Sequence, residues 1–363
     1  MRMSKSNYPV KIEAVCEVDS KYAIGISADA NGVFRFNLDS GTGTYISMVP
    51  NEGIRKKRLY TTACNKGGLI YFTPFTANDI AVLDTDNYSI FKKEIKNPSG
   101  YSEGRKFSGV VEYGNYLFMT PCTYPAVLRI NTLTGEMDYY DNWVDGQKFI
   151  FRKSPEVVGS HFYVPSVSSD LLLDFDMERC EGYLHHLGVG RGYWSSCFVD
   201  DYLWLAPIHQ DPIIRWDIHK HTIDKLTEYP KGFEGRDFLF TKIYLNNEGL
   251  FAIPARANMC LRIDINKMEL NRAPIDEITG NRVTEFLAQM KGCLYLATKS
   301  DEGDKYIKLK MEDNTIEPFA FHINDDERKR YCVDFVTDMA EYSEIIRENS
   351  LINLGGFLES LTK

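Results

Sequence analysis

The feature that most constrains the fold of this chain is a segment that recurs seven times along it. Each copy has a β-rich run that often ends in Pro, a polar loop, a second β run with an Asp or Asn near its end, a turn and a third run. A repeat length of about 45 residues is typical of four-stranded β units or of two- to three-helix units. The copies align on the residues that close the first run: Ser27, Pro74, Pro121, Pro165, Pro207, Pro254 and Thr298.

The residues within each copy favour strands over helices. Runs such as Tyr116–Met119 and Tyr202–Leu205 are short and aromatic, and they are bounded by Pro, Gly, Asn and Asp. They lack the 3.6-residue spacing of a helix. A further β run precedes the run that ends in each of these aligned residues, so every copy is predicted to form four antiparallel strands. The innermost strands are expected at 11–18, 58–64, 105–111, 152–158, 193–199, 238–245 and 283–290.

Seven such units resemble the seven-bladed β-propeller superfamily, which includes WD-repeat, YVTN and kelch-like proteins. The resemblance covers about residues 10–320, but Trp216-Asp217 is the one Trp-Asp pair that ends a third strand, and no unit has a Gly-His or a kelch glycine pair. It therefore points to the fold and to no particular repeat family. It implies an all-β fold of four-stranded antiparallel blades around a channel, with ligand-binding loops on one face. We expect the propeller over residues 1–322.

The remaining residues, 323–363, are expected to form a short C-terminal helical extension. Phe335, Met339, Tyr342 and Ile346 are spaced as one apolar face of a helix. This helix could pack on or beside the propeller, or it could make a dimer or a docking surface. The sequence leaves both roles open.

Composition excludes several classes of protein. The formal net charge of −9 argues against a nucleic-acid surface. There is no signal-like N-terminus and no run of eighteen apolar residues, which predicts a cytoplasmic protein without membrane insertion. The eight cysteines show no zinc-ligand spacing, so they are expected to be reduced, and neither a metal nor a cofactor is predicted.

A set of basic residues recurs at the start of the innermost strands. Guanidinium groups suit carboxylate, sulfate or phosphate, so a circle of them at the channel mouth would be an anion site. The alternative is a repeated clamp, in which each Arg pairs with the neighbouring blade; repetition in every unit favours the clamp. The set consists of Lys11, Arg58, Arg105, Arg152, Arg191 and Arg282, with Arg236 two residues before the equivalent Phe238.

Residues that break the sevenfold symmetry are the other candidates for a site. The loops after the second strands place several polar side chains on the same face as the basic set: Asn78, Tyr124, His209, Asp211, Arg256, Asn258 and Lys299. His209 beside Asp211 could shuttle a proton, and these two are the candidate catalytic residues. Glu156, Lys242 and Glu285, on the inner strands, could project into the channel or could pair with the basic set.

These observations favour a non-enzymatic binding module that presents its loop face to a protein, a glycan or a small anion. The alternative is a lyase or hydrolase that acts on an anionic or carbohydrate substrate at the channel mouth, with arginines neutralising charge. No nucleophile–base pair, metal set or phosphate loop favours the enzyme.

Overall fold

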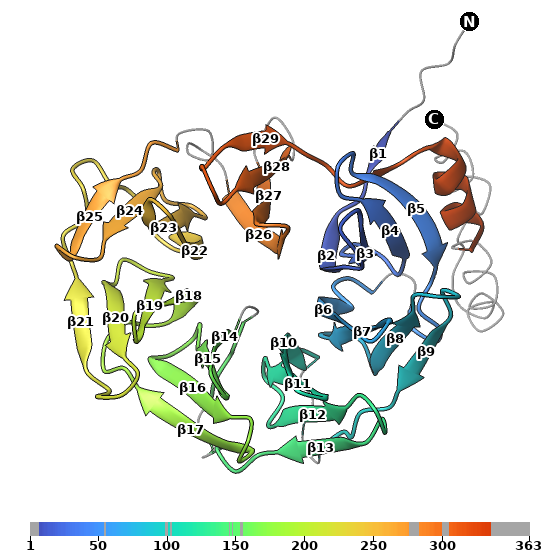
Figure 1. Cartoon of the computed structure of the whole chain (residues 1–363), viewed down its shortest axis with the longest axis horizontal. Helices are drawn as coiled ribbons and strands as arrows, with labels where there is room; N and C mark the ends of the chain where they lie inside the picture. The colour runs from blue at the N-terminus through green and yellow to red at the C-terminus, as the bar shows by residue number, and fades with distance from the viewer. Residues whose placement is uncertain are drawn as a thin grey trace, which may run out of the picture.

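Seven β-sheets stand in a ring around a central axis, as the repeat predicted (Figure 1). The computed structural model describes residues 7–53, 56–98, 101, 104–144, 146, 148–152, 155–275, 283–299 and 305–334. Each sheet contains four consecutive antiparallel strands, which we call a blade, and the first strand of every blade faces the axis. The fold is therefore a seven-bladed β-propeller.

The strands follow the chain in groups of four. Blades 1 and 2 are β2 (Ile12–Glu17), β3 (Tyr22–Ser27), β4 (Val33–Asn37) and β5 (Thr42–Ser47), then β6 (Tyr60–Lys66), β7 (Leu69–Pro74), β8 (Ile80–Asp84) and β9 (Ile90–Lys93). Blades 3 and 4 are β10 (Phe107–Tyr113), β11 (Tyr116–Pro121), β12 (Val127–Asn131) and β13 (Met137–Tyr140), then β14 (Glu156–Val158), β15 (His161–Pro165), β16 (Leu171–Asp176) and β17 (Glu181–His186).

The last three blades complete the ring. Blade 5 is β18 (Tyr193–Val199), β19 (Tyr202–Pro207), β20 (Ile213–Asp217) and β21 (Ile223–Leu226). Blade 6 is β22 (Phe240–Asn246), β23 (Gly249–Pro254), β24 (Leu261–Asp264) and β25 (Glu269–Arg272). Blade 7 is β26 (Val283–Met290), β27 (Cys293–Lys299), β28 (Lys305–Lys310) and β29 (Ile316–Pro318).

The apolar core lies between neighbouring blades. Ile80 and Val82 of blade 2, for example, pack with Leu117, Met119 and Leu128 of blade 3 in one buried cluster. The alternation of side chains across each pleated strand presents apolar residues to both adjacent sheets. The ring is thus a succession of packed sheet pairs.

The Asp or Asn at the end of each of the first six third strands forms the turn that follows. The Asn131 Oδ1 atom accepts hydrogen bonds from the Leu133 and Thr134 backbone N–H groups. Asp217 does the same with His219 and Lys220. This side-chain capping of a turn explains why these residue types recur in the repeat.

Two short strands close the ring on the outer edge of blade 1. Strand β30 (His322–Ile323) pairs parallel to β5, and β1 (Tyr8–Pro9) pairs antiparallel to β30. Strand β30, which follows blade 7, thus joins the sheet of blade 1, and β1 pairs with it there. These two strands hold the ring closed (Figure 1).

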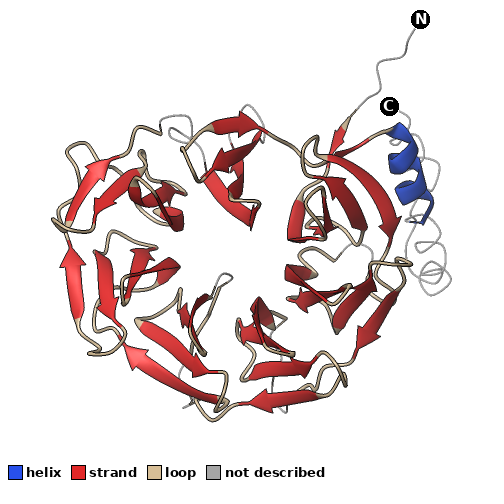
Figure 2. Cartoon of the chain, in the orientation of Figure 1, coloured by secondary structure: helices blue, strands red, loops and turns tan. Residues whose placement is uncertain are grey.

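A helix follows β30 at residues 325–334 and packs on blade 1 (Figure 2). Asn324 caps it, because its Oδ1 accepts hydrogen bonds from the N–H groups of Asp326 and Glu327. The Tyr331 ring lies 5.4 Å from Phe34 and 5.1 Å from Tyr45, measured between ring centroids. Over its described residues, the helix therefore packs on blade 1, the blade that the closing strands join. The predicted apolar stripe from Phe335 to Ile346 lies outside the described residues.

Two further properties bear on the sequence-based expectations. No helix among the described residues is both long enough and apolar enough to cross a membrane. All eight cysteines lie in described segments and are free thiols.

Candidate functional site

The inner strands share a β-bulge at one place in five of the seven blades. One extra residue interrupts the pairing of β2, β6, β10, β18 and β22 with the next strand. A bulge re-aims the extra side chain, and bulges are frequent beside functional sites. Here the five extra residues all line one pocket at the channel mouth: Glu13, Thr61, Ser108, Trp194 and Thr241.

This central pocket has a volume of about 430 Å³ and opens on the face formed by the inter-blade loops and the loops after the second strands. Four cationic residues among the described part of the chain line it, and each stacks on an aromatic ring that also lines it. The cation-to-centroid distances are 5.2 Å for Arg58 over Phe75, 4.9 Å for Arg152 over Trp194, 5.6 Å for Arg256 over Phe238 and 5.5 Å for Lys242 over Phe286.

Arg58 is paired with a buried carboxylate across a blade boundary. Its Nη2 donates a hydrogen bond of 2.7 Å to the Oε1 atom of Glu13, which is 3% exposed. Burial opposes the charge on Arg58, but Glu13 outweighs it and raises the pKa of the guanidinium. Arg58 therefore acts as the inter-blade clamp that the repeat suggested.

Arg152 has the opposite environment. Its Nε atom, like that of Arg58, is buried without a hydrogen-bond partner, but no carboxylate forms an ion pair with its guanidinium among the described residues. Burial is the main cause that lowers the pKa of Arg152, and repulsion from Arg58 and Arg105 adds to it. The guanidinium lies over the Trp194 ring of blade 5, and attraction to Cys122 and Glu13 opposes the pKa shift without cancelling it.

Two residues of the pocket have unusual backbone conformations. Arg58 and Phe238 occupy equivalent positions before the inner strands of blades 2 and 6, with φ angles of 55° and 53°. A bulky residue at positive φ is uncommon and costs free energy. Strain of this kind gathers where a side chain is held for function.

Most hydroxyl groups of the pocket bind the protein's own backbone. Thr61 Oγ1 donates to the Phe107 carbonyl and Ser108 Oγ donates to the Pro121 carbonyl. Ser195 Oγ accepts from the Ile243 N–H group, and Thr241 Oγ1 accepts from the Phe286 N–H group. These hydroxyls join adjacent strands and blades, which leaves cations and aromatic faces as the main groups open to a ligand.

A second pocket of about 530 Å³ extends from the first towards the C-terminal ends of the inner strands. The two pockets share Glu13, Thr61, Lys242 and Phe286. Glu156 lines the second pocket, where burial raises the pKa of its carboxyl group and Lys242, 3.8 Å away, opposes the shift. Glu156 and Lys242 thus line the channel, as expected from the sequence.

The predicted circle of basic residues is corrected in two places. The residue that pairs with the closing residue of the second strand is Tyr60 in blade 2 and Ile12 in blade 1. Val10 is thus the equivalent of Arg58, and Lys11 lies one residue later.

In blade 4 the second strand ends at Pro165 as predicted, but the bridge to the inner segment lies one residue later, between Phe151 and Ser166. Four residues of the sequence separate Phe151 from Glu156, whereas two separate Ser166 from Tyr163, with which Glu156 pairs. Arg152 therefore takes the place of a bulge residue, three positions after the Arg58 equivalent.

The other predicted arginines do not line the central pocket. Arg105 and Arg236 are exposed, and Arg191 lies beside Asp211, which accepts the Arg191 backbone N–H at 3.0 Å and has its Oδ2 3.5 Å from Nε. Arg191 thus pairs within its own blade. Arg282 lies outside the described residues.

The candidate residues in the loops also divide into those that line the central pocket and those that lie elsewhere. Arg256 lines the central pocket. Tyr124 is 1% exposed in the core between blades 2 and 3, and its hydroxyl donates to the Lys96 carbonyl. His209 lies with its Nδ1 atom 2.7 Å from Asp237 Oδ1, so its carboxylate neighbour is Asp237 and not Asp211.

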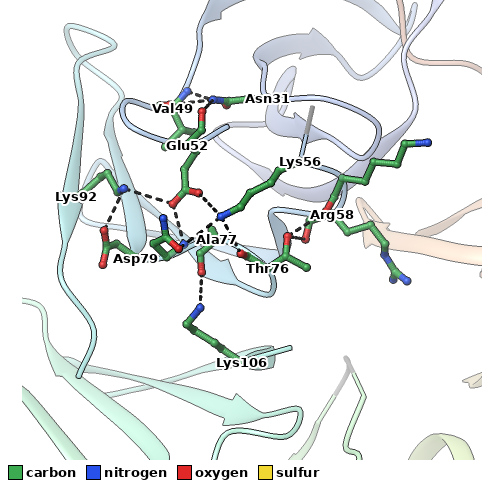
Figure 3. A network of polar contacts seen from close by, with 12 residues as sticks. Asn31, Val49, Glu52, Lys56, Arg58, Thr76, Ala77, Asp79, Lys92 and Lys106 are labelled. Carbon is green, nitrogen blue, oxygen red and sulfur yellow. Dashed lines mark hydrogen bonds and ion pairs between the residues drawn. The ribbon is translucent and has the colours of Figure 1, made fainter. Parts of the chain in front are cut away.

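A separate polar network on blades 1 and 2 was missed at the sequence level (Figure 3). The buried Glu52 carboxylate is 3.3 Å from both Lys56 Nζ and Lys92 Nζ, and it accepts the Asn78 N–H at 2.8 Å. Lys92 Nζ also lies 3.0 Å from Asp79. The Arg58 side chain points away from Glu52 in this view. Asn78, a predicted site residue, is therefore engaged in structure.

Sequence reasoning also missed Trp194 and Phe238, which the structure brings to the pocket. Trp194 is the aromatic member of the bulge positions, and Phe238 was noticed as the position without an Arg. The signal for Phe238 was an aromatic residue at a position of the repeat where other copies have a basic residue. Trp194 had no such signal, because the bulge depends on strand pairing.

Comparison with known proteins supports the fold and no narrower family. No protein-family model and no curated protein sequence matches the chain. The structure is similar to virginiamycin B lyase from Staphylococcus aureus, with a TM-score of 0.60 and 15% identity over 81% of this chain and 95% of that chain.

Two more solved structures give the same result. A streptogramin B lyase has a TM-score of 0.57 and 15% identity over 82% of this chain and 92% of that chain. The computationally designed Ika8 protein has a TM-score of 0.57 and 9% identity over 87% and 89%. At such identities the likeness shows the fold alone. The chain is a seven-bladed β-propeller protein whose central pocket is lined by stacked cations.

Proposed function

We propose that the protein binds a small anionic ligand in the central pocket. Three arginines and a lysine line a concave space of about 430 Å³, which suits a small molecule. The cations lie at the channel mouth, where low-dielectric walls strengthen their attraction for a negative group.

Arg152 is the observation that carries this proposal. Arg152 is a half-buried cation that no carboxylate pairs with among the described residues, which is unfavourable in the empty pocket, and burial lowers its pKa. A bound carboxylate, sulfate or phosphate would accept its N–H groups and neutralise its charge. The pocket is thus more stable when an anion is present.

A lyase or hydrolase activity on such an anion is the second candidate. The carboxylates of Glu13 and Glu285 line the same pocket as the arginines. A carboxylate next to a bound anion could take up a proton during an elimination. Two of the structurally similar proteins are lyases, and this likeness extends only to the fold.

Thermal unfolding with added anions tests the proposal. Acetate, sulfate and phosphate at matched ionic strength should raise the Tm of the parent protein, because a ligand stabilises the state that binds it. Arg152→Gln and Arg256→Gln should each lose most of this rise. Arg179→Gln, at an exposed site in the β16–β17 turn, is the matched control and should keep it. An equal rise in all four proteins would contradict binding in this pocket.

Turnover is measured separately. Any anion that raises the Tm is incubated with the protein, and the products are analysed by mass spectrometry. An unchanged ligand would leave binding as the function, whereas a product that Glu285→Gln abolishes would establish the second candidate.

A further inference from the structure

We propose that the bound anion is carried by a flat aromatic ring, which packs against the edge-to-face pair of Trp194 and Phe238 while its acidic group is bound by Arg152 or Arg256. This inference rests on the proposed function and adds the chemical class of the ligand, an aromatic carboxylate or aryl phosphate. It depends on four side chains contributed by blades 4, 5 and 6.

The two rings meet edge to face and form an angled platform, and a guanidinium lies over each ring. The Trp194 and Phe238 centroids lie 5.1 Å apart, with an interplanar angle of 77°. Arg152 stacks on the Trp194 ring and Arg256 on the Phe238 ring. A guanidinium that stacks by its face keeps its N–H edge available for a paired hydrogen bond to a planar acid. The platform therefore offers both a stacking surface and an anion fork.

Phe238 is placed in a way that packing within the protein does not require. Its side chain is 37% exposed at the pocket, and its backbone has a φ of 53°. An exposed apolar ring and a strained backbone each cost free energy in the empty protein. A ligand ring stacked on Phe238 would bury that exposed face. The same argument does not apply to an inorganic anion, which has no apolar surface.

The pocket hydroxyls favour an aromatic ring over a sugar. A sugar ring requires hydrogen-bond partners for each of its hydroxyl groups once it is removed from water. Thr61, Ser108, Ser195 and Thr241 already bind backbone groups. Besides these hydroxyls, Thr284 and the carboxylates of Glu13 and Glu285, the lining consists of rings, cations and Ala255, which match a flat apolar ring that carries one acid.

Intrinsic fluorescence can report this stacking directly. The chain has four tryptophans, of which Trp143, Trp204 and Trp216 are at most 4% exposed in the core. Trp194 is partly exposed in the pocket. A ring bound on Trp194 should therefore change the emission of the parent protein, and acetate should change it little.

The experiment compares anions that differ in the ring. Benzoate and phenyl phosphate are titrated against acetate, inorganic phosphate, cyclohexanecarboxylate and glucuronate, with affinities from calorimetry. Benzoate should bind roughly 3- to 10-fold more tightly than cyclohexanecarboxylate, which is the gain that ring stacking supplies. Glucuronate binding more tightly than benzoate would overturn the inference in favour of a sugar acid.

Two variants separate this inference from the proposed function. Phe238→Leu should remove the preference for benzoate and change the affinity for acetate by a smaller factor. Phe91→Leu, on the exposed side of β9, is the control and should change neither. If all the anions bind equally and Phe238→Leu has no effect, the proposal of an aromatic ligand is wrong, whereas the proposal of an anion site is retained. If no anion binds to the parent protein, the proposed function itself fails.

Discussion

Two sides of the same loop face use basic residues in opposite ways. On blades 1 and 2, the side chains of Lys56, Lys92 and Arg58 lie beside the carboxylates of Glu52 and Glu13. On blades 4 to 6, Arg152 and Arg256 stack on aromatic rings, and no carboxylate pairs with either of them among the described residues. The comparison shows that residue type alone does not define an anion site.

The partner defines the role of each cation. The buried Glu52 already pairs with Lys56 and Lys92, so these lysines have little charge left for a ligand. The paired cations of blades 1 and 2 therefore stabilise the structure. A guanidinium that lies on an aromatic ring keeps both its charge and its N–H edge. Under this interpretation, substitutions on the paired side should change stability, and substitutions on the stacked side should change binding.

The largest expected effect is at Glu52. Glu52→Gln leaves Lys56 and Lys92 near a neutral amide, and breaking a buried pair in this way should lower the free energy of unfolding by about 3 kcal/mol. Urea unfolding followed by circular dichroism measures the change. Glu269→Gln, at an exposed position on β25, should change it by less than about 0.5 kcal/mol. Equal stabilities of the two variants would show that the ion pairs of Glu52 do not stabilise blades 1 and 2.

A smaller loss of stability is expected for Arg58→Gln. The change removes a charged donor from the buried Glu13, which should cost about 1 to 3 kcal/mol, towards the lower end because the Arg58 side chain is 40% exposed. The same urea experiment provides the value. No loss of stability would show that the ion pair of Arg58 with Glu13 does not hold blades 1 and 2 together.

Arg152→Gln should change stability little, within about 0.5 kcal/mol, and the change could be an increase. Its half-buried charge pairs with no carboxylate in the described part of the chain and is repelled by Arg58 and Arg105, so its removal relieves an unfavourable interaction. Anion affinity should fall in the same variant by roughly tenfold or more, as expected for the loss of a charged hydrogen bond. A large loss of stability without a loss of affinity would reverse the comparison.

The smallest effect is a pH dependence at Lys106, on the edge of the paired side. Burial lowers its pKa below the ordinary 10.5 of lysine, with a contribution from Lys56, and its Nζ donates to the Ala77 carbonyl at 2.8 Å. Between the lowered pKa and 10.5 the unfolded chain binds more protons than the folded one, so this group makes stability rise with pH.

Lys106→Met removes that term. The Tm of the variant minus that of the parent should therefore become more negative as pH rises towards 10.5, which scanning fluorimetry between pH 8 and 10.5 can follow. Lys225→Met on β21 is an exposed control, and its difference should stay level. A level difference for Lys106→Met as well would show that its charge is not destabilising.

The repeat by itself determined the fold. Short aromatic runs, closing residues such as Pro74 and Pro121, and turn formers such as Asn131 act within a few residues of the chain. Turn chemistry and strand propensity are local, so they are visible in the sequence. A spacing of about 45 residues then set the number of blades.

The site depended on interactions that the repeat does not encode. The turn between β2 and β3 is longer than that between β6 and β7, which moved Lys11 out of register with Arg58. The extra residues before β14 moved Arg152 from the predicted circle into the pocket. Equal spacing could not reveal these shifts.

Seven blades, their strands and their turns were thus determined by the sequence, because their causes lie within each repeat. The tertiary structure alone decided that Arg58 pairs with Glu13 of another blade, that Arg152 lies on Trp194, and that Phe238 stands exposed between them and Arg256. A bulge is fixed by how a strand pairs with its neighbour, and a partner by how the blades pack. Both arise only when residues distant in sequence come together.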